Sequence, residues 1–491
     1  MNGMRRLGLL VIALLAACTA GQPQAPNSST ITSSASPLRI GSPPASEAPP
    51  ILPGLPTDLE RTRYSIDATY DFNAHTLSAS QSIRYVNQSD IDLNQLILRS
   101  FAHNYGADLQ ITGLKRADGG LVDTFEDGEG RWSVHLFDPL PPNHDVNLQV
   151  TFTLSLPNAN GPLGWNAPQT NFIDWYPFIP PFFHSGFYEY TDREPALVGE
   201  YQVYESADFD VHLEIINAPS TLTVAAAGIP LEVGSEELAF SLINARRFAW
   251  SASSMYSQLS SEQNGVPVSI YFFEDQRDAA EASLEVAQQA LEIYAGLFGP
   301  YPYQSLSIVE ATFPDGMESD GLFFLDQSYF RTYSYNRRNY LTALTAHEVA
   351  HNWWFGLVGN DQAQQPWLDE ALATYSELLY YENAYPVLVD WWWEFRINRF
   401  EPVGWVDSTI YEHSAFSPYV QAVYMRGALF LHEVRAAIGD EAFFGFLREY
   451  AASGAGGIVS AGEFFWQLAN ASSMDLTPLT DEYFRLRDDQ Q

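Results

Sequence analysis

The period of the hydrophobic pattern changes near residue 275, and this change divides the chain into two parts that must fold differently. Before it, apolar and polar residues alternate, most clearly over Val146–Leu156. Alternation of this kind is typical of a strand with one buried face. It recurs near residues 77–85 and 209–215, with Pro and Gly clusters between the runs. We therefore expect residues 58–252 to form a mostly antiparallel β-sheet domain.

Beyond residue 275, apolar residues recur at helical spacing from Leu284 to Phe298, and the stripe stops at Gly299-Pro300. A short strand pattern follows at Ser305–Phe313. Helices then dominate, one of them with a capping-box arrangement at Ser460–Glu463. With 491 residues the chain exceeds one ordinary core. The fold class we predict is multidomain α+β: an N-terminal antiparallel sheet domain, then a mainly helical domain with some sheet over residues 253–491.

The composition is that of a folded and strongly acidic protein. Hydrophobic residues make up 46% of the chain, which supplies enough apolar side chains for packed cores. The 60 Asp and Glu against 24 Lys and Arg give a formal charge of -36. A surface of this sign repels phosphate backbones, which argues against nucleic acid as a partner. We interpret the charge as a solubility property and infer no substrate from it.

The N-terminus has the pattern of an export signal. Two arginines, Arg5 and Arg6, precede an apolar run over Leu7–Leu15 that is too short to span a bilayer. The sequence Leu-Ala-Ala-Cys that ends at Cys18 resembles the lipobox of bacterial lipoproteins, in which the cysteine becomes the lipidated N-terminus. An ordinary signal peptide with a chance cysteine is the alternative. We predict a signal peptide over residues 1–18, and an extracytoplasmic protein anchored to a bacterial membrane through a lipid on Cys18.

Residues 19–57 are rich in Pro, Ser, Ala, Thr and Gly and lack aromatic residues. Such a segment cannot bury enough apolar surface to fold, so we expect a disordered tether. Because Cys18 is the only cysteine, an intramolecular disulfide is excluded.

The second part contains two histidines with the spacing of metal ligands. His347 and His351 lie four residues apart in the segment Tyr340–Phe355, which lacks Pro and Gly, and Glu348 follows the first histidine. We expect this segment to be one helix. Residues four apart on a helix share a face, so both imidazoles can reach one tetrahedral cation. Glu348 lies beside them, where it can take a proton from a metal-bound water without being a ligand. The arrangement suits hydrolysis.

Glu370 provides a third ligand, after eighteen intervening residues and within the helix-like stretch Trp367–Leu372. A His, His and Glu set leaves one position of a tetrahedral cation open for water. A structural zinc site is instead usually closed by four ligands rich in cysteine. We therefore predict one catalytic Zn²⁺ per chain, held by His347, His351 and Glu370.

This pattern resembles the HExxH, eighteen residues, Glu motif of gluzincin zinc metallopeptidases of the aminopeptidase N (membrane alanyl aminopeptidase) family. The likeness continues through Asn352–Gly356, and Trp367–Glu370 resembles the family's WLNE segment with Asp369 in place of Asn. The resemblance covers roughly residues 60–485 and is closer in the second half. It implies a β-rich first domain, a thermolysin-like catalytic domain, and removal of N-terminal residues from peptides. Together with the export signal, this predicts an aminopeptidase that acts outside the cell.

The resemblance also implies how the substrate amine is bound. Gly316, Met317 and Glu318 lie in a segment similar to the family's GxMEN motif, whose glutamate binds the free amine. Asp315 and Ser319 replace the usual Gly and Asn. A carboxylate near the metal would pair with a cationic N-terminus and limit cleavage to the first residue. An exposed loop carboxylate is the alternative interpretation of Glu318.

Tyr424 begins a segment, Tyr424–Ala428, that resembles the family's YxKGA motif, whose tyrosine stabilises the tetrahedral intermediate. A phenol can donate a hydrogen bond to the developing oxyanion. Tyr419, five residues earlier, is a candidate to assist it. The chain has 27 tyrosines, so a role in the core or on the surface is the alternative for each. In the expected mechanism zinc activates a water, and Glu348 takes its proton and returns it to the leaving amine.

Two other functions compete with an aminopeptidase. An endopeptidase could use the same zinc site, since the GxMEN segment is imperfect and the large C-terminal helical domain of full-length relatives has no counterpart here. Without that helical domain over the cleft, we also expect the site to admit larger peptides. A catalytically silent surface binding protein could instead use aromatic residues such as Trp391–Trp393 as a contact patch.

Overall fold

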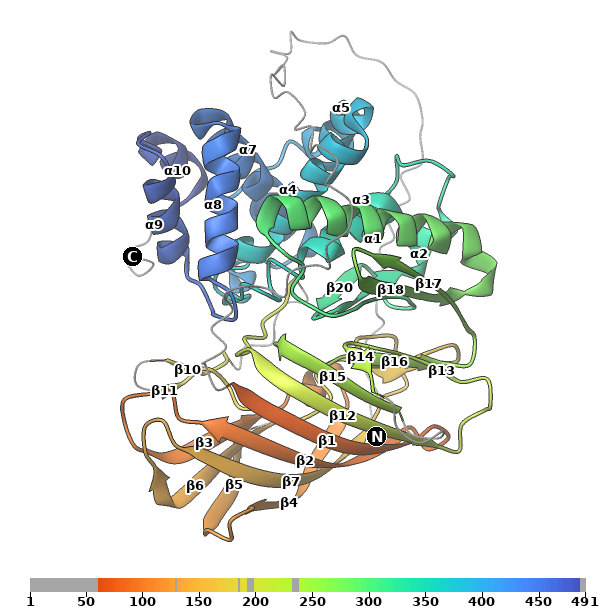
Figure 1. Cartoon of the computed structure of the whole chain (residues 1–491), viewed down its shortest axis with the longest axis vertical. Helices are drawn as coiled ribbons and strands as arrows, with labels where there is room; N and C mark the ends of the chain where they lie inside the picture. The colour runs from red at the N-terminus through yellow and green to blue at the C-terminus, as the bar shows by residue number, and fades with distance from the viewer. Residues whose placement is uncertain (1–60, 129, 184–185, 192–197, 232–237, 486–491) are drawn as a thin grey trace, which may run out of the picture. The chain divides into compact units, whose positions relative to one another are not determined.

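The structure is a computed structural model that describes residues 61–128, 130–183, 186–191, 198–231 and 238–485 (Figure 1). The predicted signal peptide, the lipidation site Cys18 and the tether over 19–57 lie outside these residues. The described residues all belong to one compact unit. Within them, no helix has both the length and the apolar character that crossing a bilayer requires.

The first half is built on a large sheet whose strands alternate buried and exposed residues, as β7 does along its length. The strand order is β14-β15-β12-β1-β2-β7-β4, and every pairing is antiparallel except that of β1 with β12. The strands of this sheet are β1 (Thr62–Asp71), β2 (Thr76–Val86), β4 (Asp108–Arg116), β7 (Asp145–Ser155), β12 (Ala207–Ile216), β14 (Ile229–Pro230) and β15 (Leu238–Ala245). The predicted antiparallel sheet domain is confirmed.

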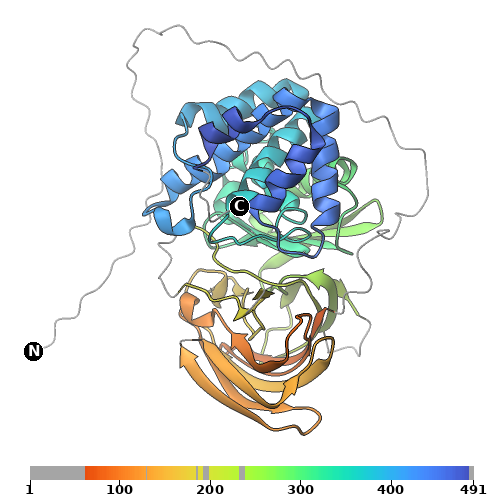
Figure 2. The same ribbon diagram turned by 90° about the vertical axis from the view of Figure 1, so that its left-hand side faces the viewer.

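Smaller sheets accompany the large one, and Figure 2 shows that the strands of this half are strongly curved. They comprise β3 (Leu93–Arg99), β5 (Val122–Gly128) and β6 (Arg131–Leu140); β8 (Leu163–Trp165), β9 (Thr170–Phe172), β13 (Thr223–Ala226) and β16 (Trp250–Ser253); and the short pair β10 (Phe182–Phe183) and β11 (Gly186–Phe187). A 3-10 turn, η1 (Ala102–Tyr105), follows β3. Aromatic rings fill the core between the sheets. The rings of Phe172 and Trp250 stack with centroids 3.7 Å apart, a large apolar contact at the centre of this half.

The second half begins with a five-stranded sheet of order β17-β18-β19-β21-β20. Its strands are β17 (Tyr256–Gln263), β18 (Val266–Phe273), β19 (Leu306–Ala311), β20 (Gly316–Ser319) and β21 (Leu322–Asp326). The connection from β18 to β19 contains α1 (Arg277–Phe298), which ends before Gly299 as its apolar stripe predicts. The Tyr294 hydroxyl of α1 lies 3.1 Å from the Ala346 carbonyl and 2.8 Å from the Ser376 carbonyl. Because those carbonyls belong to two later helices, α1 ties three helices together.

Helices make up most of the remaining chain, as predicted. They are α2 (Gln327–Arg331), α3 (Tyr340–Ala350), α4 (Trp367–Ala384), α5 (Val389–Trp392), α6 (Phe416–Val420), α7 (Arg426–Ile438), α8 (Asp440–Ser453), α9 (Ala461–Ala471) and α10 (Thr477–Tyr483). The 3-10 turn η2 (Glu274–Gln276) precedes α1. Further 3-10 or π turns lie between some of the later helices: η3 (Pro386–Leu388), η4 (Trp393–Ile397), η5 (Asn398–Phe400), η6 (Ile410–Glu412) and η7 (Gln421–Met425). The predicted capping box at Ser460–Glu463 is present and begins α9.

The helix expected over Tyr340–Phe355 is shorter than predicted, since α3 ends at Ala350 and His351 caps it. The Asn352 side chain explains the early end. Its Nδ2 atom donates to the carbonyls of Glu348 (3.3 Å) and Val349 (3.0 Å), which a continuing helix would use itself. The chain then turns back so that Trp353 and Trp354, which follow directly, are both buried.

Arg246, just before β16, joins the two halves. It is buried, and its guanidinium donates to the carbonyls of Tyr204 (2.8 Å) in the first half and Gly457 (2.6 Å) in the second. It also donates to the carbonyl of Phe355. The domain boundary expected between residues 252 and 253 falls between β16 and β17 and stays a prediction.

Glu310 on β19 is a buried carboxyl whose effect on stability should depend on pH. Its Oε2 accepts from the Phe273 backbone N–H (2.8 Å), and burial raises its pKa from 4.5 to about 8. The folded state therefore keeps a proton that the unfolded state loses. The protonated Glu310 side chain therefore contributes to the free energy of unfolding. This contribution is complete below the pKa of Glu310 in the unfolded chain and is lost as pH rises through its pKa in the folded chain, at roughly 1.4 kcal/mol per pKa unit.

The variant Glu310→Gln keeps the shape of the neutral side chain and cannot ionise. We expect the variant to gain thermal stability relative to the wild-type protein between pH values of about 5 and about 9. Thermal unfolding of both proteins across this range measures the difference. A difference that does not change with pH would mean that Glu310 ionises normally in the folded state.

Candidate metal centre and active site

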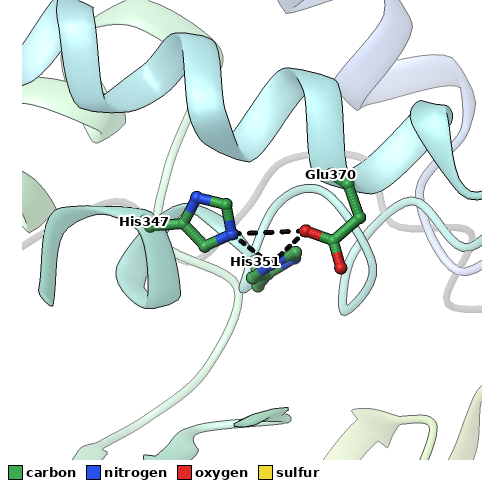
Figure 3. Close-up of side chains that lie close together, drawn as sticks. All are labelled: His347, His351 and Glu370. Atoms are coloured by element: carbon green, nitrogen blue, oxygen red, sulfur yellow. Dashed lines mark hydrogen bonds and ion pairs between the residues drawn. The ribbon is translucent and has the colours of Figure 1, made fainter. Parts of the chain in front are cut away.

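Two helices bring three ligand atoms together. His347 lies in the last turn of α3, His351 caps that helix, and Glu370 lies in the first turn of α4, three residues after Trp367. The Nε2 atoms of the two histidines are 3.1 Å apart. The Oε2 atom of Glu370 lies 3.3 Å from Nε2 of His347 and 3.5 Å from Nε2 of His351. Figure 3 shows the three side chains converging on one point.

This triangle of donor atoms has the dimensions of a zinc site. Bonds of 2.0–2.1 Å in a tetrahedral arrangement separate the ligand atoms by about 3.3 Å. Two imidazole nitrogens that face each other at 3.1 Å cannot both use their lone pairs unless a proton or a cation lies between them. His347, His351 and Glu370 are all buried, so the carboxylate also requires a nearby positive charge. The residues fit zinc, with one position left open.

The other nitrogen of each imidazole is hydrogen-bonded. Nδ1 of His347 lies 3.1 Å from Oε1 of Glu377, and Nδ1 of His351 lies 3.0 Å from the Trp354 carbonyl. Both partners are acceptors, so each Nδ1 carries the proton and each Nε2 is free to bind a cation. The sequence analysis missed Glu377. A signal was present, since Glu377 follows Glu370 by two helical turns on α4 and so lies on the same face.

Glu348 faces the open side of this centre. It is buried, and among the described residues its Oε2 has no hydrogen-bond partner. Burial raises the pKa of Glu348 to about 8, and the two neighbouring histidines act in the opposite direction. A Cβ atom at Gly316 would overlap the Glu348 carboxylate. A residue without a side chain is therefore needed at Gly316, which the structure places beside Glu348.

Glu318 lies on β20 and is only 3% exposed, so the alternative of an exposed loop carboxylate is wrong. Gln362 donates to its Oε1 (2.9 Å), and a guanidinium nitrogen of Arg247 lies 3.8 Å away. One ligand atom each from Glu318, Glu348 and His351 lie within 4.8 Å of one another. Glu318 thus lies close to Glu348 and to the candidate metal ligand His351.

Glu200 is a second carboxylate near Glu318 that the sequence analysis did not identify. Burial and the negative charge of Glu318 raise the pKa of Glu200 well above its usual value. It comes from the first half, in a stretch that carries no motif. Only the folded structure brings Glu200 near Glu318, and no local pattern predicts that contact.

Tyr424 lies in the turn η7, with its ring parallel to that of His347 at a centroid distance of 6.1 Å. Burial and the neighbouring Glu370 raise the pKa of Tyr424 well above its usual value, so it keeps the proton needed to donate a hydrogen bond. Tyr419 is buried against Tyr424, with ring centroids 5.6 Å apart. Its hydroxyl has no hydrogen-bond partner among the described residues.

These side chains surround a cleft of about 1410 Å³. The second half contributes the predicted site residues Gly316, Met317, Glu318, His347, Glu348, His351, Glu370 and Tyr424 to its lining. The first half contributes others, among them Tyr105, Glu200 and Gln202. Tyr419 stands behind Tyr424 and does not line the cleft. Every predicted site residue of the described chain therefore lies in or directly behind one cleft.

Comparisons with known proteins find a matching family profile and several relatives. Residues 282–483 match the profile of the Peptidase family M1 domain. Human endoplasmic reticulum aminopeptidase 2 is 28% identical over 184 residues, which cover 36% of this chain and 19% of the relative. Aminopeptidase N of Lactobacillus delbrueckii subsp. lactis is 26% identical over 226 residues, covering 41% and 26%. The matches thus span about a fifth to a quarter of these relatives.

The fold has a match over almost its full length. The M1 zinc metallopeptidase from Deinococcus radiodurans superposes with a TM-score of 0.61 at 17% sequence identity, over 86% of this chain and 92% of that structure. The sequence match covers the segment with the metal ligands, and the structural match extends to the β-rich half. Residues 282–483 thus carry the similarity to the Peptidase family M1 domain, and the fold resembles that of a solved M1 zinc metallopeptidase.

Proposed function

We propose that this protein is a zinc-dependent aminopeptidase that removes N-terminal residues from peptides outside the cell. The observation that carries the proposal is the position of Glu318 and Glu348, which with His351 bring ligand atoms within 4.8 Å of one another. A peptide amine held by Glu318 would put the first carbonyl group, about 2.5 Å from that amine along the chain, beside Glu348 and the metal ligands. Cleavage after the first residue follows from that spacing.

Each residue of the centre has a chemical task in this proposal. His347, His351 and Glu370 would hold zinc, which would supply Lewis acidity and promote deprotonation of water near neutral pH. Glu348 takes the proton of the attacking water and delivers it to the leaving amine. The raised pKa of its carboxyl suits a group that must both accept and return a proton.

The remaining side chains orient the substrate. Glu318 and Glu200 both line the cleft. Burial and the charge of Glu318 raise the pKa of Glu200, and an ammonium group bound there would favour its ionised form. Tyr424 keeps its phenolic proton and would donate it in a hydrogen bond to the oxygen of the attacked carbonyl. The solved M1 metallopeptidase of Deinococcus radiodurans has been obtained with a Tyr-Ser-Ala substrate, which supports peptides as the substrates here.

The extracellular part of the proposal depends on the N-terminal sequence. Arg5 and Arg6, the short apolar run over Leu7–Leu15 and Cys18 support export and attachment to a bacterial membrane through a lipid. The Pro- and Ser-rich segment over 19–57 would tether the folded part to the anchor.

An endopeptidase on the same zinc site is the second candidate. Asp315 and Ser319 depart from the family's GxMEN motif, and a cleft of about 1410 Å³ has room for several residues of a peptide. A silent binding protein is disfavoured, because the ligands, Glu348 and Tyr424 are all in place around one cleft.

The variant Glu348→Gln tests the role of the carboxylate. We expect it to bind zinc as the wild-type protein does, because Glu348 is not a ligand, and to lose activity by about 100-fold or more. Zinc content and peptide hydrolysis measure the two effects separately, and chelation of zinc from the wild-type protein should abolish hydrolysis. Undiminished activity of Glu348→Gln would show that another group moves the proton.

A peptide series with free and with acetylated N-termini tests the exopeptidase assignment. We expect only free N-termini to be cleaved, because acetylation removes the charge that Glu318 and Glu200 would bind. The variants Glu318→Gln and Glu200→Gln should raise the KM for free peptides, with the larger effect at Glu318. Cleavage of acetylated peptides at internal bonds would replace the proposal with an endopeptidase.

The variant Tyr424→Phe tests the oxyanion hydrogen bond. It removes one oxygen atom and keeps the ring that packs beside His347, so we expect kcat to fall by about 100-fold with little change in KM or zinc content. Tyr419→Phe serves as the matched control, since Tyr419 does not line the cleft. Equal effects of the two changes would argue against a direct role for the Tyr424 hydroxyl.

A further inference from the structure

Glu377 on α4 is fully buried and is bonded at both carboxylate oxygens. Oε1 lies 3.1 Å from Nδ1 of His347 and accepts from Nη2 of Arg396 (2.7 Å). Oε2 accepts from Nε of Arg396 (2.7 Å) and from Nε1 of Trp392 (3.0 Å). A carboxylate has about four lone-pair positions, so these four contacts leave it no freedom to rotate.

The two outer donors come from one short segment after α4. Trp392 is the last residue of α5, and Arg396 lies in the π turn η4 that follows. Both are buried and both point at Glu377, although an ordinary helix places residues four apart at slightly different angles. The wider π turn is a known way to adjust such angles, often at functional sites.

Trp392 is the middle residue of the three adjacent tryptophans, and its neighbours have different contacts. Trp391 stacks on Phe395 with ring centroids 4.6 Å apart, and Trp393 packs against His432 at 4.7 Å. Both are only partly buried. Among the described contacts of these three indoles, only that of Trp392 reaches Glu377. Its neighbour Trp391 is therefore a matched control.

We propose that Trp392 and Arg396 are positioning residues for the metal centre, acting through Glu377 on His347. Arg396 balances the buried charge of Glu377 with a two-point contact, and Trp392 fixes the carboxylate in the plane that receives the Nδ1 proton of His347. His347 is then held with Nε2 unprotonated and aimed at the point where His351 and Glu370 also meet. The segment Val389–Ile397 thus sets the affinity for zinc without touching it.

A purely structural role for the same contacts would have different consequences. Removing a donor would then lower the stability of the apoprotein, and zinc affinity would change only as far as the protein unfolds. A positioning role predicts weaker zinc binding in a protein that is still folded. The two are separated by measuring zinc affinity and apoprotein stability on the same variants.

The test compares Trp392→Phe with Trp391→Phe in the whole protein. Apoprotein is titrated with zinc in competition with a chelator, and its thermal unfolding is recorded without metal. We expect Trp392→Phe to raise the zinc dissociation constant by about tenfold, and Trp391→Phe to leave it within about twofold. Glu377→Gln, which changes one atom of the acceptor, should raise it further, by up to about 100-fold.

The proposal is overturned if Trp392→Phe and Trp391→Phe have equal zinc affinities, or if the loss of affinity follows the loss of apoprotein stability. If Trp392→Phe does not fold, Glu377→Gln decides: unchanged zinc affinity in the folded variant would also overturn the proposal. The absorption of the cobalt-substituted protein reports ligand geometry and should change in Trp392→Phe but not in Trp391→Phe. None of these readouts depends on whether the protein cleaves peptides.

Discussion

The cost of burying negative charge governs the centre of this protein. Four carboxylates, Glu318, Glu348, Glu370 and Glu377, are buried within a small volume on α3, α4 and β20. Arginines balance two of them: Arg396 pairs with Glu377, and Arg247 lies 3.8 Å from Glu318. Glu348 and Glu370 have no arginine partner among the described residues. A divalent cation held by His347, His351 and Glu370 would supply the missing charge, which links the folded arrangement to metal binding.

Local pattern predicted the fold well where burial alone decides it. Alternation identified β7, and the apolar stripe identified α1 and its end at Gly299. The sequence pattern failed at the end of α3. Helical spacing does not reveal that a side chain competes with backbone N–H groups for the carbonyls of the last turn. Asn352 does this, and its effect depends on the turn that buries Trp353 and Trp354.

The candidate site divides in the same way. The ligands, Glu348, Glu318 and Tyr424 stand in short motifs, so sequence alone could name them. Arg396 and Glu200 could not be named, since each is defined by its place beside a distant segment that no motif spans. Glu377 had a signal in its helical spacing from Glu370, but its bond to His347 appears only in the folded chain. Buried arginines and carboxylates also look ordinary in a sequence with 60 acidic residues. Only the folded structure distinguishes the arginines and carboxylates that contact the metal ligands or line the cleft from those that face water.

Arg246 has a consequence for how the cleft works. Its guanidinium donates to carbonyls of both halves. Any motion that widened the cleft by moving the halves apart would therefore leave a buried charge and several backbone carbonyls without hydrogen-bond partners. Such a hinge is energetically stiff. In the proposed function, peptides would therefore enter through an opening of nearly constant width, and the bulk of their side chains, not a closing movement, would select among them.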